Sequence, residues 1–129
     1  MKQRIRKKLL AKRKSLSGER IRAKSRIIAQ RLFELPELRN ARTVMFYVSQ
    51  GSEVNTHRMI RDALRKGRRV AVPVSRPEGR KMLPVIIRDP DRELSPGFRG
   101  ILEPVPEKER TIEPSEIDLF ILPGVAFDR

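Results

Sequence analysis

The stretch TVMFYV, residues 43–48, is apolar at almost every position and has the length of a single β-strand. A strand that is apolar on both faces is typical of a parallel sheet covered by helices. A polar loop around Gly51 follows, then residues 56–66 with helical spacing, then a second apolar strand at 69–73. A strand, a helix and a strand in this order predict a βαβ unit, so the sequence indicates an α/β fold.

The helix inside this unit has clear limits. Thr56 is a good N-cap residue, and Gly67 can end the helix because glycine adopts the left-handed conformation easily. The apolar residues lie on one face of this helix: Met59, Ile60, Ala63 and Leu64. The face that packs on the sheet is therefore expected to be this one.

Two further helices are expected before the first strand. Ser17 can cap the second of them, Glu19 suits its positive end, and Pro36 should end it. Apolar residues recur at near-helical spacing through both: Ile5, Leu9 and Leu16 in the first, and Ile21, Ile28, Leu32 and Leu35 in the second. The sequence thus predicts a helical pair over residues 1–35.

The remainder of the chain contains two more candidate strands. Residues 82–87 could form one, although Pro84 restricts it to an edge or a bulge. Residues 118–122 predict a third buried strand, and residues 88–116 should follow the surface with one short ordered piece near Ile101. We expect one domain over residues 1–129: a three-layer, Rossmann-like, open and mostly parallel sheet with helices on both faces, preceded by a basic helical pair.

Composition excludes several classes of protein. With no cysteine the chain has no disulfide framework, thiolate zinc site or cysteine nucleophile. No apolar run approaches the roughly 20 residues of a membrane span, so we expect a cytoplasmic protein that does not bind membranes. His57 is the only histidine, which favours a structural role over a metal site or catalytic triad.

The net charge of +14 is concentrated at the N-terminus. Residues 1–35 hold 13 of the 30 lysines and arginines and two of the 16 acids, which leaves +11 there and +3 on the other 94 residues. Such a segment attracts nucleic acid, anionic membranes or small anions. Lys2, Arg4 and Arg6 are among the basic residues that could clamp a phosphate or simply form a solvated helix face.

The topology predicts where a ligand would bind. In open α/β sheets ligands bind beyond the carboxyl ends of the strands, where residues 49–56, 73–77 and 123–128 should converge. Glu53 is the only acidic residue in the first of these loops. It is either a contact for a polar ligand or a solvated loop carboxylate.

Six segments of the chain, in order, resemble those of the 5-formyltetrahydrofolate cyclo-ligase family. They are KQRIR at 2–6 with Leu16, Ser17 and Ser25 after it, YVS and EVNT at 47–49 and 53–56, GRRV at 67–70 with Pro73, GILEP at 100–104, IDL at 117–119 and PGVAFD at 123–128. No one segment is specific, but their common order is. The resemblance covers the whole chain.

The resemblance implies an ATP-dependent reaction. The γ-phosphate of ATP passes to the formyl oxygen of 5-formyltetrahydrofolate, a folate nitrogen closes the ring, and phosphate leaves to give 5,10-methenyltetrahydrofolate, with Mg²⁺ on the phosphates. Residues Lys2, Gln3, Arg4, Ile5 and Arg6 would contact ATP. Three residues would contact the folate, which could carry a polyglutamate tail: Val48 as apolar wall, Glu53 as acceptor to the pterin, and Met82. The resemblance supplies no catalytic residue and no metal ligand.

The resemblance also implies an active-site segment that these 129 residues do not contain. Family members continue into a glycine-rich R-L-G-x-G-x-G-Y-Y-D loop that cradles the triphosphate. We therefore expect weak turnover or none from this chain alone, and a monomer that binds no nucleic acid. The alternatives are a basic nucleic-acid-binding module and a non-catalytic folate-binding paralogue.

Overall fold

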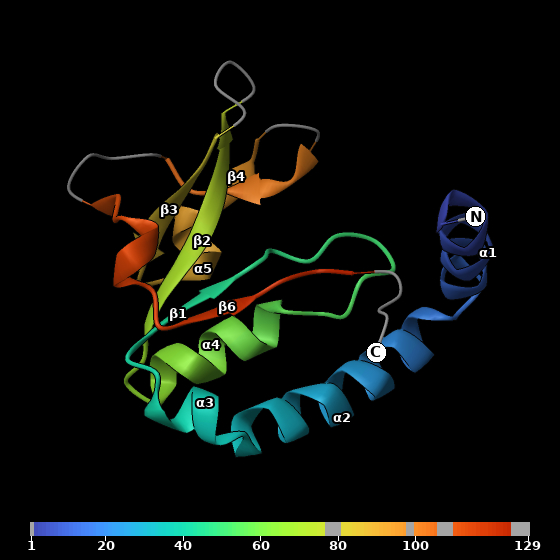
Figure 1. Cartoon of the computed structure of the whole chain (residues 1–129), viewed down its shortest axis with the longest axis horizontal. Helices are drawn as coiled ribbons and strands as arrows, with labels where there is room; N and C mark the ends of the chain where they lie inside the picture. The colour runs from blue at the N-terminus through green and yellow to red at the C-terminus, as the bar shows by residue number, and fades with distance from the viewer. Residues whose placement is uncertain (1, 77–80, 98–99, 106–109, 125–129) are drawn as a thin grey trace.

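The structure is a computed structural model that describes residues 2–76, 81–97, 100–105 and 110–124. Its elements follow one another along the chain as α1 (Lys2–Lys14), α2 (Gly18–Glu34), α3 (Pro36–Asn40), β1 (Thr43–Phe46), α4 (His57–Arg65), β2 (Arg69–Arg76), β3 (Lys81–Ile87), α5 (Pro90–Glu93), β4 (Ser95–Pro96), β5 (Leu102–Glu103), the 3₁₀ helix η3 (Pro114–Glu116) and β6 (Leu119–Ile121). Figure 1 shows the helices α2, α3 and α4 gathered below the main sheet.

The main sheet has the strand order β3-β2-β1-β6. β1 pairs in parallel with both β2 and β6, whereas β3 pairs antiparallel with β2. All four residues of β1 are buried, as expected for a strand with neighbours on both sides. Pro84 lies on β3 at the edge of the sheet, where a residue without an N–H is tolerated. The open, mostly parallel sheet predicted from the sequence is confirmed.

The larger core lies between the sheet and the helices. Alternate strand residues such as Val44, Phe46, Val70 and Val72 point to this face and pack with α3 and α4. The opposite face carries a smaller cluster of Met45, Ala71, Ile112 and Ile117, with Ile86 against it. In the described residues this second face is covered by the segment that contains η3, and the α-helices α2, α3 and α4 all pack on the first face.

The N-terminal pair of helices is confirmed, but its packing differs from the prediction. Ser17 caps α2 by accepting a hydrogen bond from the backbone N–H of Arg20 at 3.2 Å. The residues of α2 that pack on the core are Ala29, Leu32 and Phe33. Ile28 is 43% exposed. The packed face therefore keeps the predicted Leu32 but is rotated toward Ser25, Ala29 and Phe33.

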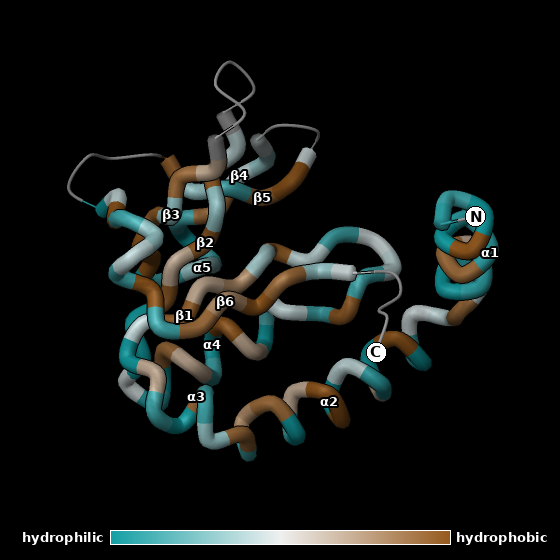
Figure 2. The backbone as a smooth tube through the Cα atoms, in the orientation of Figure 1, coloured by the Kyte–Doolittle hydropathy of each residue, from teal (hydrophilic) through white to brown (hydrophobic). Residues whose placement is uncertain are grey.

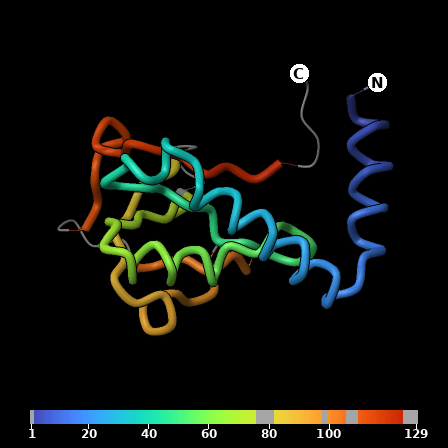
Figure 3. The backbone as a smooth tube through the Cα atoms, turned by 90° about the horizontal axis from the view of Figure 1, so that it is seen from below, coloured from blue at the N-terminus to red at the C-terminus, as the bar shows by residue number. Residues whose placement is uncertain are grey.

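Helix α1 contributes nothing to the core. None of its residues is buried, and Ile5 is 53% exposed. Figures 1 and 3 show α1 standing away from the sheet at an angle to α2, and Figure 2 shows a helix that is hydrophilic along most of its length. The predicted helix is present, but its apolar stripe from Ile5 to Leu16 has no partner in the described part of the chain beyond partial cover of Leu9, Leu10 and Leu16.

Helix α4 ends as the sequence predicts. Gly67 has φ of +83°, its N–H donates to the carbonyl of Leu64, and the N–H of Arg68 donates to the carbonyl of Ala63. These two bonds form a Schellman motif, which satisfies carbonyls that the helix end leaves free. The start differs, because Thr56 occupies the N-cap position without capping through its side chain. Its hydroxyl serves the preceding loop instead.

The segment between β3 and β6 is more ordered than the sequence predicts. The short hairpin β4–β5 is tied to β2 by Glu103, which is 9% exposed and accepts a hydrogen bond from the backbone N–H of Ser75 at 3.0 Å. A Cβ at Gly97 would lie 2.5 Å from the same carboxylate, so a side chain there would displace Glu103. Ile112 also donates its N–H to the carbonyl of Pro84 at the sheet edge. These contacts join residues far apart in sequence, which a local pattern cannot reveal.

The second strand runs past its predicted end. The sequence placed a loop at residues 73–77, but β2 continues to Arg76 because Pro73, Val74 and Ser75 pair with β3. Residues 77 and 125–128 of the predicted ligand loops lie outside the described residues. In the described ranges no helix is both long and apolar enough to cross a membrane.

Candidate functional site

The candidate site is the loop between β1 and α4, residues 47–56, at the carboxyl end of β1. In Figure 1 this loop and the end of β6 both run toward α1, whereas β2 and β3 turn away. The side chain of Tyr47 reaches across the loop, and its hydroxyl donates to the carbonyl of Val54 at 2.9 Å. His57 lies against the same loop, with Nε2 3.2 Å from the carbonyl oxygen of Ser49. The only histidine thus has a structural contact.

Thr56 holds the two ends of this loop together. It is 1% exposed, its hydroxyl donates to the carbonyl of Tyr47 at 2.7 Å, and it accepts from the N–H of Ser49 at 2.9 Å. The hydroxyl of Ser49 in turn accepts from the N–H of Thr56 at 2.9 Å. Because buried backbone groups must be paired, these bonds fix the path of the chain around the candidate ligand contacts.

Glu53 has one carboxylate oxygen engaged and one available. Oε1 accepts from the backbone N–H of Gln50 at 2.8 Å, and no described residue donates to Oε2. Burial, together with a smaller effect of the negative charge of Glu53, raises the pKa of Tyr47 to about 12, and the positive charge of Arg13 opposes the shift. Tyr47 therefore stays neutral at physiological pH, beside a carboxylate that can accept a hydrogen bond from a ligand.

The basic helix α1 meets this loop at only one described hydrogen bond. Nε of Arg13 donates to the hydroxyl of Ser52 at 3.0 Å. The predicted ATP contacts Lys2, Gln3, Arg4, Ile5 and Arg6 are all exposed near the other end of the helix. At 1.5 Å per residue they lie about 10 to 17 Å along the axis from Arg13. The structure brings α1 to the loop but leaves these five residues in solvent.

The predicted folate contacts are arranged unevenly. Val48 and Glu53 share the loop, although Val48 is 6% exposed and packs into the main core. Met82 is 57% exposed and lies opposite Ser75 on β3. Since β3 is two strands from β1, Met82 is at least about 10 Å from the end of β1. The described structure therefore groups the first two residues and leaves the third apart.

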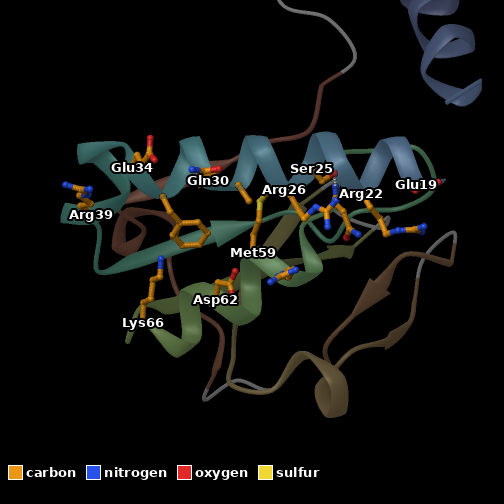
Figure 4. A pocket seen from close by; sticks show the side chains of 14 residues that line it. Glu19, Arg22, Ser25, Arg26, Gln30, Glu34, Arg39, Met59, Asp62 and Lys66 are labelled. Carbon is orange, nitrogen blue, oxygen red and sulfur yellow. Dashed lines mark hydrogen bonds between the residues drawn. The ribbon is translucent and has the colours of Figure 1, made fainter. Parts of the chain in front are cut away.

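A separate groove lies between α2 and α4, and none of the predicted site residues lines it. It has a volume of about 830 Å³ (Figure 4). Basic, acidic, small polar and apolar side chains line this α2–α4 groove: Glu19, Arg22, Ser25, Arg26, Ala29, Gln30, Phe33, Glu34, Arg39, Asn55, Arg58, Met59, Asp62 and Lys66. Its link to the loop is Asn55, whose backbone N–H donates to the hydroxyl of Ser25 at 2.9 Å.

The described residues contain no group of three or more histidine, aspartate or glutamate side chains that could hold a metal ion. Mg²⁺ prefers carboxylates together with substrate phosphates. The described side chains therefore do not form a magnesium cage by themselves, and we assign no chemical step to the metal.

Comparison with known proteins assigns the family. The sequence profile of the 5-formyltetrahydrofolate cyclo-ligase family matches residues 1–129. The chain belongs to this family. It is 30% identical over 117 residues to the 5-formyltetrahydrofolate cyclo-ligase of Escherichia coli K12, and 28% identical over 102 residues to that of Haemophilus influenzae. These alignments cover 91% and 79% of this chain, but only 64% and 54% of the two relatives.

Solved structures agree with this cyclo-ligase assignment. The NMR structure of the Aquifex aeolicus 5,10-methenyltetrahydrofolate synthetase matches with a TM-score of 0.83 and 32% identity, over 98% of this chain and 62% of that one. The synthetase from Mycoplasma pneumoniae has the same fold, with a TM-score of 0.66 at 21% identity, over 95% and 63% of the two chains. The chain thus spans roughly three fifths of the length of these relatives.

The segments that carried the resemblance have physical roles in the fold of this chain. Thr56 and Tyr47 brace the loop, Gly67 ends α4, and Glu103 anchors the hairpin. Sequence reasoning missed the α2–α4 groove, because its lining comes from three helices, α2, α3 and α4, and from the loop before α4. The only sequence signal of this groove was Ser25, a small polar residue on the packed side of a helix.

Proposed function

We propose that this chain forms the folate-binding part of an enzyme that converts 5-formyltetrahydrofolate and ATP to 5,10-methenyltetrahydrofolate, ADP and phosphate. The observation that carries the proposal is the match of the family profile to residues 1–129. Because the chain spans about three fifths of its relatives, the activity of the whole enzyme is part of the proposal and not a property of these residues alone.

The loop between β1 and α4 suits the proposed folate contact. Oε2 of Glu53 can accept hydrogen bonds from the pterin amino and ring N–H groups, while Oε1 stays bonded to the loop. Val48 would supply an apolar wall behind the ring, and Met82 would have to approach from β3. Because the two carboxylate oxygens have different partners, the loop can keep its shape whether or not the ligand is bound.

The basic face of α1 suits the proposed ATP contact. Lys2 and Arg6 are four residues apart, so they lie on one face of the helix, and both are exposed. Charge-assisted hydrogen bonds from these groups would hold and orient the triphosphate. The transferred phosphoryl group turns the formyl oxygen into a good leaving group, and the folate nitrogen then closes the ring with loss of its proton. When bound, Mg²⁺ would neutralise charge on the phosphates.

Turnover assays test the proposal. We expect ATP- and Mg²⁺-dependent formation of methenyltetrahydrofolate, followed by its near-ultraviolet absorbance, from the product of the complete reading frame, and weak turnover or none from the 129-residue chain. Folate binding without turnover in the complete product would instead support a non-catalytic paralogue. Lys2→Gln with Arg6→Gln should raise the KM for ATP, whereas Lys7→Gln with Lys14→Gln on the same helix should not.

A separate binding assay distinguishes the alternative of a nucleic-acid-binding module. Helix α1 carries eight lysines and arginines and no acid, so weak, salt-sensitive binding to nucleic acid is expected of any such helix. Filter binding that stays submicromolar at physiological salt would favour that alternative. We propose a monomer that binds folate and ATP and has no nucleic acid partner.

A further inference from the structure

We propose that one end of the α2–α4 groove binds the glutamate carboxylates of the folate substrate through Arg22, Arg26 and Arg58. These three residues are called the arginine cluster below. The inference rests on the proposed function, because it assumes that a folate binds at the loop that contains Glu53. It adds a second subsite, for the opposite end of the same molecule.

The arginine cluster faces a common space. Arg22 and Arg26 are one helical turn apart on α2, and Arg58 lies in the first turn of α4 across the groove. Figure 4 shows Arg22 and Arg26 extending from α2 into the space between the two helices. Guanidinium groups bind carboxylates through paired parallel hydrogen bonds, so three of them around one opening fit a ligand with one or more carboxylates.

None of these three arginines has a partner within the described residues. The described salt bridges all involve other side chains. The guanidinium groups of Arg22, Arg26 and Arg58 donate no described hydrogen bond. Glu19, the acid on the same side of the groove, also forms no ion pair there. All three arginines are exposed and make no described ion pair, so each is available to an anionic group that enters the groove.

Two neutral donors, Ser25 and Asn55, line the same groove as the arginine cluster. Ser25 is only 6% exposed, and its oxygen already accepts from the N–H of Asn55, so its hydroxyl proton is left for another acceptor. The side-chain oxygen of Asn55 accepts from the hydroxyl of Ser49 at 3.3 Å, which leaves its amide N–H groups to donate. A buried hydroxyl and an amide that both lack an acceptor in the described structure make this end a site for an acceptor-only group, as a carboxylate is.

The position of this end suits the tail of a ligand held at the loop. Asn55 lines the groove and lies two residues after Glu53 on the same braced loop. We therefore place the pterin of the ligand at Glu53 and its tail past Asn55, toward the arginine cluster. The groove floor beyond is apolar, with Ala29, Phe33 and Met59, and suits the methylene groups between carboxylates.

The lining disfavours a nucleic acid as the occupant. Glu19, Glu34 and Asp62 all line the groove among its five basic residues. A phosphate backbone would lie against all three carboxylates along the groove, whereas a ligand with its charge at one end meets the arginine cluster with only Glu19 on that side. The groove thus matches an amphipathic carboxylate better than a polyanion of uniform charge.

The test compares two ligands that differ only in the glutamate. The affinity of the 129-residue chain is measured by isothermal titration calorimetry for 5-formyltetrahydrofolate and for 5-formyltetrahydropteroate, which has the same pterin and benzoyl groups and no glutamate. The variant is Arg22→Gln with Arg26→Gln. Its matched control is Arg20→Gln with Arg31→Gln, which removes the same charge from exposed positions of α2 outside the groove lining.

We expect the chain to bind the glutamate-bearing ligand at least about tenfold more tightly, since charged hydrogen bonds of this kind are worth a factor of ten or more. The groove variant should lose that preference, and the control should keep it. The Arg58→Gln variant, on the other helix, should lose part of the preference for the glutamate-bearing ligand. Because it leaves α2 unchanged, it shows that the loss does not come from misfolding of α2. Equal melting temperatures of the variants and the wild-type chain show the same.

Three results would overturn the inference. The first is equal affinity of the wild-type chain for the two ligands, which leaves the proposed folate site intact. The second is a preference that survives in both the Arg22→Gln/Arg26→Gln and the Arg58→Gln variants. The third is no binding of either ligand to the folded chain, which would reject the folate-binding role of this chain together with the subsite.

Discussion

Replacing Thr56 with valine removes one hydroxyl and keeps the shape of the side chain. In the native structure that hydroxyl donates to the carbonyl of Tyr47 and accepts from the N–H of Ser49, so one small group pairs two backbone groups of the loop. Thr56 is 1% exposed, and water cannot easily replace it. The substitution therefore leaves both backbone groups without their partner.

The expected cost follows from these two bonds. An unpaired buried donor or acceptor costs about 1–3 kcal/mol, so Thr56→Val should lower the free energy of unfolding by about 2–4 kcal/mol. Thr56→Ser keeps the hydroxyl and loses one buried methyl group, which costs about 1 kcal/mol. Against a typical total of about 5–15 kcal/mol, the valine variant loses a large share of the stability.

Urea unfolding followed by circular dichroism measures the effect. Thr43→Val is the matched control, because Thr43 is also buried, lies at the start of β1 away from the loop, and its hydroxyl makes no described hydrogen bond. The control should unfold at about the wild-type urea concentration. The affinity for 5-formyltetrahydrofolate should also fall in Thr56→Val at temperatures where the protein is still folded, because the loop no longer holds Glu53 in place.

Two outcomes would refute this reasoning. If Thr56→Val and Thr43→Val are equally stable, the hydroxyl of Thr56 does not brace the loop. If Thr56→Ser is as unstable as Thr56→Val, the methyl group and not the hydrogen bonds accounts for the loss.

Three further predictions test other parts of the structure. The single tyrosine, Tyr47, should titrate near pH 12 by ultraviolet absorbance; because its pKa is raised in the folded state, stability should fall as pH rises from about 10 to 12, and Tyr47→Phe should remove that slope. Gly67→Ala should lower the free energy of unfolding by about 1–2 kcal/mol because φ is positive there, whereas Gly18→Ala should be neutral or slightly stabilising in urea titrations. Backbone N–H groups of Thr43 and Arg42 lower the pKa of Asp118, so the stability it adds is present above its ordinary pKa and is lost as pH falls through the lowered one; Asp118→Asn should flatten the acid limb of the stability–pH curve.

The sheet could be predicted because its signals are local. The apolar run at residues 43–48, the edge proline Pro84 and the helix stop at Gly67 each act within a few residues, and each has the predicted role in the structure. Of the packed face of α2, only Leu32 was predicted. Ile28 is more apolar than Ser25, but Ser25 is the buried residue, because a small side chain fits against the loop.

The candidate site was only partly within reach of sequence reasoning. Glu53 stood out as the one acid in its loop, and the structure gives it an oxygen that no described residue occupies. The arginine cluster did not stand out, since Arg22, Arg26 and Arg58 are three of 30 basic residues and become neighbours only when α2 packs beside α4. The ATP contacts on α1 remain a prediction, because the described structure leaves Lys2 to Arg6 in solvent.

The affinity of the 129-residue chain for 5-formyltetrahydrofolate, with and without Glu53→Gln, tests the central claim most directly. Glutamine keeps the oxygen that accepts from Gln50 and removes the charge and acceptor strength offered to the pterin, so the loop should keep its shape. We predict measurable binding by the wild-type chain and a loss of at least about tenfold in the variant, without a change in melting temperature. Equal affinities in the two proteins would contradict the account.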